Sequence, residues 1–154
     1  MQYRIFRQGP GEENAAEIGT SATPDYVDGG AQYDIPYRYR VIAFKGLAES
    51  LSSNEVGITP KDIFPPSPPA SITALAGPSS VEVSWQRSPE PDLKGYYVYR
   101  SVDGSQFVQA GGLLSVPTYS DRDVQHGKVY RYEVSAIDQK NNPSAKSASA
   151  EVTF

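Results

Sequence analysis

The sequence predicts an all-β protein of two antiparallel β-sandwiches in tandem, the first of which lacks its first two strands. Three observations predict this architecture. A pattern of residues returns after 93 positions, short segments alternate between apolar and polar residues, and no stretch has the period of an amphipathic helix. The composition agrees, because the 154 residues include 11 tyrosines, which suit strands, and 13 prolines and 13 glycines, which suit turns.

The repeat covers three segments at one offset without a gap. Residues 3–7 align with 96–100, residues 25–28 with 118–121, and residues 37–43 with 130–136. A repeat of this length is a whole domain rather than a solenoid unit. We therefore expect a partial module in residues 1–60, a proline-rich linker in residues 61–69 and a complete module in residues 70–154.

The complete module is expected to begin with apolar contacts from Ile72 and Leu75, after a proline-rich segment. Residues 81–85 then alternate strictly, which places Val81, Val83 and Trp85 on one face of a strand. Further short strands are expected at residues 96–100, 107–108, 118–120, 130–136 and 150–154. Short strands with regularly spaced turn signals are typical of a two-sheet sandwich.

The partial module is expected to start at the third strand of the sandwich. Its strands are predicted at residues 3–7, 16–18, 25–27, 37–43 and 56–58. The expected inward side chains are Tyr3, Ile5, Tyr37, Tyr39, Val41, Val56 and Ile58. No segment corresponds to the first two strands, so these side chains would face no opposite sheet. Because uncovered apolar side chains and open strand edges are unfavourable, we expect residues 3–58 to be covered. The candidates are an upstream segment of the same gene product, a second copy of the chain, or a larger complex.

The order of the motifs resembles the fibronectin type III module, an immunoglobulin-like sandwich. The motifs are Val-x-Val-x-Trp at residues 81–85, Gly-Tyr-x-Val at 95–98 and Tyr-x-Tyr-x-Val-x-Ala at 130–136. The resemblance covers residues 65–154 almost completely and residues 3–60 from the third strand onward. The Gly-Tyr-x-Val-Tyr-Arg form of the motif at residues 95–100 is similar to that of bacterial members of the family. The resemblance implies that Trp85 packs under the sheet interface and that Tyr130, like Tyr37 in the first copy, forms a tyrosine corner.

Charge and composition exclude several classes of function. The net charge is −4 and neither half of the chain carries a basic stripe, which argues against nucleic acid as a partner. The absence of cysteine excludes disulfides and thiolate metal sites. No segment reaches the ~20 apolar residues of a membrane span, and the N-terminus lacks the pattern of a signal peptide.

No set of residues predicts catalysis, a metal site or a cofactor. His126 is the one histidine, so no catalytic triad can be assembled, and we expect it in a solvent-facing turn. Asp121 and Asp123 offer too few oxygen ligands for calcium. Glu90 and Asp92 flank a proline in a loop, where we expect them to be solvated. We therefore expect that the chain is not an enzyme and binds no cofactor.

One expected surface combines aromatic and arginine side chains. Strand alternation places Tyr97, Tyr99 and Arg131 on the outer face of the larger sheet. The equivalent row in the partial module is Arg4, Phe6, Arg38 and Arg40. Tyrosine and arginine are enriched in contact surfaces, which makes this row a candidate contact surface for a protein or, by stacking on sugar rings, a glycan. The alternative is that these side chains pack across the strands and stabilise the sheet.

These observations predict a non-catalytic module that acts outside the cytoplasm as an interaction or spacer element. Its role would be protein–protein contact or structural support. The location, whether secreted, periplasmic or at the cell surface, is implied by the family resemblance. Two other interpretations stay open. In the first, the chain is an accessory, glycan-contacting region of a secreted polysaccharide-degrading enzyme. In the second, it is a small structural subunit or lipoprotein of a larger envelope complex.

Overall fold

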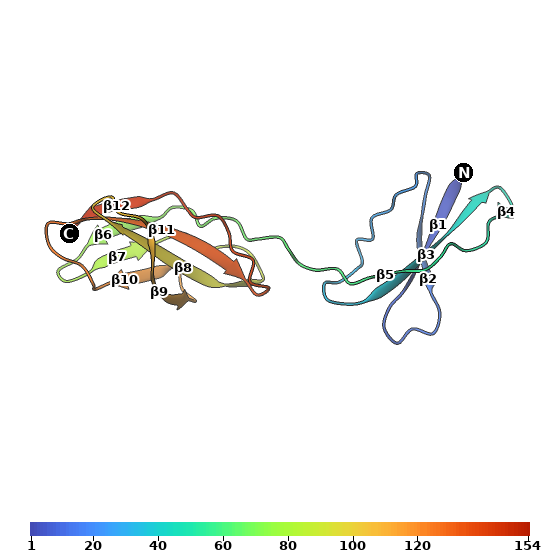
Figure 1. Ribbon diagram of the computed structural model, residues 1–154, viewed down its shortest axis with the longest axis horizontal. Coiled ribbons are helices and arrows are strands. Elements are labelled where there is room, and N and C mark those ends of the chain that lie inside the picture. Colours follow the sequence, from blue (N-terminus) through green and yellow to red (C-terminus); the bar gives the residue numbers. More distant parts are fainter. The chain divides into compact units, whose positions relative to one another are not determined.

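The computed structural model describes residues 1–154 and contains strands and loops but no helix. Its contacts divide the chain into two compact units, Met1–Asp62 and Ile63–Phe154, which we call the first and the second unit. Figure 1 shows the strands of each unit. The prediction of an all-β, antiparallel architecture is confirmed. No helix is present that would be able to span a lipid bilayer.

The second unit is a sandwich of two antiparallel sheets (Figure 1). One sheet has three strands in the order β10-β7-β6, and the other has four in the order β12-β11-β8-β9. The strands are β6 (Thr73–Ala76), β7 (Val81–Ser84), β8 (Leu93–Val102), β9 (Val108–Leu114), β10 (Thr118–Asp121), β11 (Val129–Asp138) and β12 (Ala150–Thr153). The β8–β9 hairpin turns at Asp103 and Gly104, which both have positive φ, as the predicted tight turn requires.

The core of the second unit lies between the two sheets, where the predicted alternation is confirmed. Val81, Val83 and Trp85 are buried on one side. The facing side chains on β8 and β11 are almost completely inaccessible: Tyr96, Val98, Tyr130, Tyr132, Val134 and Ala136. The Trp85 ring meets the Tyr96 ring edge-on with centroids 5.3 Å apart. Trp85 Nε1 has no hydrogen-bond partner, so Trp85 contributes to the core through packing.

Two details of the second unit bear on the sequence predictions. The Tyr130 hydroxyl accepts a hydrogen bond of 2.8 Å from the Gln125 N–H, which forms the implied tyrosine corner. The expected core contact of Leu75 is wrong, because its side chain is 68% exposed. The strand alternates so that Ile72 and Ala74 contact the core, and Leu75 therefore points to solvent.

The first unit is a single five-stranded antiparallel sheet. Its strands are β1 (Gln2–Gln8), β2 (Ala16–Ser21), β3 (Tyr37–Lys45), β4 (Ala48–Glu49) and β5 (Val56–Ile58). Their order is β2-β1-β3, and both β4 and β5 pair with β3 (Figure 1). This arrangement repeats the β9-β8-β11-β12 sheet of the second unit. No strands correspond to β6, β7 and β10, so the inner face of this sheet has no opposite sheet.

The inner face of the first unit is correspondingly more exposed. Ile5 and Tyr37 are buried, whereas Tyr3, Tyr39 and Val41 are only half-buried. Val56 and Ile58 are 49% and 51% exposed. The equivalent side chains on β8 and β11 of the second unit are fully buried because β6 and β7 cover them.

The prediction of a strand at residues 25–27 is wrong, since these residues form no strand. Their counterparts in the second unit belong to β10, which pairs with β7. The first unit contains no counterpart of β7. A strand is defined by pairing, so a segment with the right local sequence stays irregular when its partner strand is missing.

Serine side chains complete the hydrogen bonding of the last long strand in both units. On β11 the Val134 N–H donates to Ser147 Oγ at 3.0 Å, while the Ser147 N–H donates to the Val134 carbonyl at 2.8 Å. Ala136 and Ser144 repeat this exchange. On β3 the same bonds join Val41 with Ser53 and Ala43 with Ser50. The segments that carry the serines are not strands.

Candidate functional site

The outer face of β8 and β11 carries the predicted row of the second unit. Tyr97 and Tyr99 are half-buried and Arg131 is exposed. Lys146 Nζ lies 4.2 Å from the centroid of the Tyr99 ring and 3.5 Å from a carboxylate oxygen of Glu133. Arg131 Nε donates to Glu151 at 2.6 Å. The cations of this face are therefore each paired with a carboxylate, and the Tyr99 ring is covered by one of them.

The equivalent face of the first unit is built in the same way from its own side chains. The Arg40 guanidinium lies 5.0 Å from the centroid of the Phe6 ring, and the Arg4 guanidinium lies 4.8 Å from that of Phe44. Arg4 also pairs with Glu49. Sequence reasoning missed Phe44, although it lies on the same side of β3 as Arg40 by simple alternation.

The same face carries one further predicted cation. Arg38 lies on β3, two positions from Arg40, and pairs with Glu55 at 3.4 Å. The Arg38 side chain is largely exposed, so this ion pair contributes little to stability. Arg4 and Arg38 are thus paired with carboxylates, whereas Arg40 lies over Phe6, so the aromatic rings of this face are covered by cations.

A hydrogen-bonded network inside each unit repeats at the offset of the sequence. In the second unit, Tyr132 Oη donates to Asp121 at 2.8 Å, and Arg100 Nη1 donates to both carboxylate oxygens at 3.1 and 3.0 Å. Arg100 also donates to Asp123. Asp121 is 1% exposed, so its oxygens are held by these partners in the core. The network explains why these residue types recur, and it is structural.

The network of the first unit is more open. Tyr39 Oη donates to Asp28 at 2.7 Å, and Arg7 Nη1 donates to the same carboxylate at 3.2 and 3.0 Å. Burial would raise the pKa of Asp28, but the bonds from Tyr39, the Gly30 N–H and Arg7 hold it below its usual range. Burial and the bond to Asp28 raise the pKa of Tyr39 to about 12. Burial and the bond to Asp121 likewise raise the pKa of Tyr132 above its usual range.

The remaining candidate residues lie apart from one another. His126 is exposed and stacks on Phe154 with ring centroids 4.5 Å apart, as expected for a turn residue. Glu90 accepts hydrogen bonds from the N–H and the hydroxyl of Ser67 at 3.3 and 3.2 Å. These side chains brace loops, and the structure does not bring them together.

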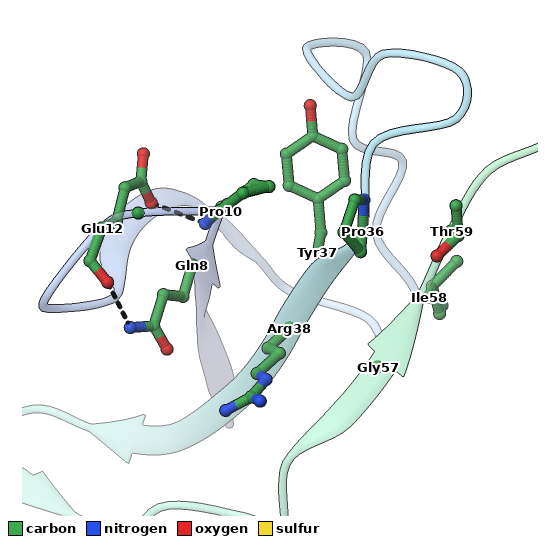
Figure 2. A pocket seen from close by; sticks show the side chains of 11 residues that line it. Gln8, Pro10, Glu12, Pro36, Tyr37, Arg38, Gly57, Ile58 and Thr59 are labelled. Carbon is green, nitrogen blue, oxygen red and sulfur yellow. Dashed lines mark hydrogen bonds between the residues drawn. The ribbon is translucent and has the colours of Figure 1, made fainter.

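A hollow of about 450 Å³ lies at one end of the first sheet, between the β1–β2 turn and the strands β3 and β5 (Figure 2). Its one carboxylate, Glu12, accepts a hydrogen bond from the Gly9 N–H at 2.7 Å. Gln8 Nε2 donates to the Glu12 carbonyl at 2.7 Å, so both groups hold their own turn. The Tyr37 phenol accepts from the Gln32 N–H at 3.2 Å, which repeats the tyrosine corner of the second unit.

The chain is similar to short regions of longer proteins. No family model matches the chain. Exoglucanase B of Cellulomonas fimi is 30% identical over 98% of the chain, and amylopullulanase of Thermoanaerobacterium saccharolyticum is 28% identical over 82% of it. The chain spans only 14% and 10% of the lengths of these two relatives.

Solved structures give the same fold. A Fn3-like protein from Clostridium thermocellum superposes with a TM-score of 0.51 at 24% identity, over 58% of this chain and 93% of that one. The chicken CNTN1 FN1–FN3 domains superpose with a TM-score of 0.56 at 16% identity, over 99% of this chain and 56% of that one.

The fold therefore defines a class of antiparallel β-sandwich modules. Within that class the chain has the fibronectin type III fold, as the sequence motifs predicted. Its first unit has the fold from the third strand onward.

Proposed function

We propose that residues 1–154 form a non-catalytic interaction and spacer region of a larger extracytoplasmic protein, and that this larger protein degrades a polysaccharide. The observation that carries the proposal is the match to Exoglucanase B, which extends over 98% of the chain but only 14% of the relative. A second glycosidase, amylopullulanase, matches in the same way. Two relatives of different name share this region, which supports a role separate from the choice of substrate.

The outer face of β8 and β11 in the second unit and that of β1 and β3 in the first support contact with protein more than contact with sugar. A sugar ring stacks on an exposed aromatic face, but the Tyr99 and Phe6 rings are covered by Lys146 and Arg40. Apart from Arg40, which lies over Phe6, the cations of both faces are paired with carboxylates. A mosaic of tyrosine, arginine and paired charges is typical of the rim of a protein interface.

The experiment uses an antibody raised against residues 1–154, applied to the cells and the culture medium of the source organism. We expect one extracellular polypeptide several times longer than 154 residues, and hydrolysis of cellulose or starch by that purified polypeptide. The isolated chain is expected to hydrolyse neither. A native polypeptide of about 17 kDa without activity would contradict the proposal.

The purified chain also tests the mode of contact. We expect no retention on insoluble cellulose or starch, with bovine albumin as the matched control. Retention that is lost in Tyr97→Ser/Tyr99→Ser would show that the outer face of the second unit binds glycan instead of protein.

A further inference from the structure

A groove of about 190 Å³ opens on the inner face of the first unit. Its floor is apolar and consists of Tyr3, Ile5 and Val41, and one wall is the segment from Ser21 to Tyr26. We infer that this groove binds an antiparallel β-hairpin whose inner strand reads apolar-x-apolar-x-Trp. We further infer that the polypeptide leading into β1 supplies this hairpin. The inference does not depend on whether the parent protein degrades a polysaccharide.

The second unit shows how an equivalent groove is filled. The counterparts of Tyr3 and Val41 are Tyr96 and Val134, and both are fully buried. Trp85 covers this position and meets the Tyr96 ring edge-on at 5.3 Å. Because the residues of the floor match in the two units, an indole is the side chain that the groove of the first unit fits best.

The backbone beside the groove is ready for strand addition. In the second unit the Trp85 N–H donates to the Pro117 carbonyl at 3.1 Å, and the residues after Pro117 pair with β7 as strand β10. Pro24 is the counterpart of Pro117. The backbone of residues 24–27 makes no hydrogen bond in the structure, and Val27 is 88% exposed. An open run of peptide groups next to an apolar groove is the geometry that binds an added strand.

The source of the hairpin follows from the position of its ends. In the second unit, β7 leads through a short loop into Leu93, the first residue of β8. The same loop in the first unit would join the hairpin to the start of β1. A second copy of the chain is a poorer source, because Val81 and Val83 of its own β7 are buried and would have to leave their core.

The experiment adds a synthetic peptide with the sequence of residues 70–86 to the full 154-residue chain and follows amide hydrogen exchange by NMR. We expect exchange at residues 3–5, 25–28 and 39–41 to slow by at least about tenfold, with no change in the second unit. A peptide with Trp85→Ala should bind more than about tenfold more weakly, because it leaves the groove empty. No slowing, or equal slowing by both peptides, would overturn the inference.

Two variants of the chain locate the site. Tyr3→Ser removes the ring that the indole meets and should weaken peptide binding by at least about fivefold. Tyr33→Ser is the matched control, since Tyr33 is exposed and does not line the groove. Equal affinities of the two variants would place the peptide elsewhere.

The source is tested by extending the chain. Residues 65–94 are copied in front of Gln2, so that a hairpin and its loop precede β1 at the spacing of the second unit. We expect this extended chain to protect the first unit by itself and to bind no added peptide. If its first unit stays unprotected while the original chain forms a dimer that protects the same residues, the occupant is a second copy and the proposed source is wrong.

Discussion

The Tyr132 hydroxyl donates a hydrogen bond of 2.8 Å to the buried carboxylate of Asp121. Tyr39 and Asp28 make the same bond at 2.7 Å in the first unit. An arginine completes each network from the same strand position. The repeat thus preserves the polar network that ties the long strand to the loop before it. The two copies differ in what lies opposite, because a second sheet covers the inner face of the second unit and none covers that of the first.

Trp85→Ala is expected to destabilise the second unit by about 3–5 kcal/mol, because it leaves a cavity in a small core. Domains of this size are stable by about 5–15 kcal/mol, so the variant should be close to unfolding. Thermal melting followed by circular dichroism measures the effect. A melting temperature within a few degrees of the original would mean that Trp85 does not support the core.

The two units are expected to differ in hydrogen exchange in the isolated chain. Amides in residues 72–154 should exchange slowly, because two sheets cover the core. Amides in residues 3–58 should exchange fast, since one face of their sheet is uncovered. Equal protection of both units in a chain shown to be monomeric by ultracentrifugation would contradict this expectation.

Replacing Tyr97 and Tyr99 together with serine is expected to weaken binding of the second unit to a protein partner, for which the proposed parent polypeptide is the first candidate. The fold should persist, because both side chains lie on the outer face. Co-precipitation of the chain with the remainder of the parent, expressed separately, measures the contact, and Tyr33→Ser serves as control. Unchanged co-precipitation would mean that the two tyrosines only pack across the strands and make no contact with the partner.

Alkaline pH is expected to loosen the first unit through Tyr39. The pKa of this phenol is raised from 10.0 to about 12, so the folded state favours the neutral form. The stability that the phenol contributes is complete below pH 10 and is lost as the pH rises through about 12. Tyr39→Phe should show one fewer late-titrating phenol in tyrosinate absorbance than the original chain, because Tyr119 and Tyr132, whose pKa values are also raised, remain in both proteins. A titration identical in both proteins would refute the assignment.

The strands and their inward faces were predictable because alternation is local. The strand of residues 25–27 was not, because its formation depends on a partner strand that the local sequence does not contain. The cation above Tyr99 was also beyond reach. It comes from Lys146, which lies in an irregular segment far away in the chain, and side-chain contacts of this kind depend on the folded sheet. The serine hydrogen bonds were not predictable from the repeat, because the offset between the two copies changes by one residue there and Ser53 corresponds to Ser147.

Those serines have a consequence for proteins that carry many such modules in series. A regular edge strand presents peptide groups on which a neighbouring molecule can polymerise. Here the free peptide groups of Val134 and Ala136 are taken up by Ser147 and Ser144, and the segment that carries the serines is too irregular to template another strand. Neighbouring modules along one polypeptide therefore find no strand to pair with at this stretch of β11.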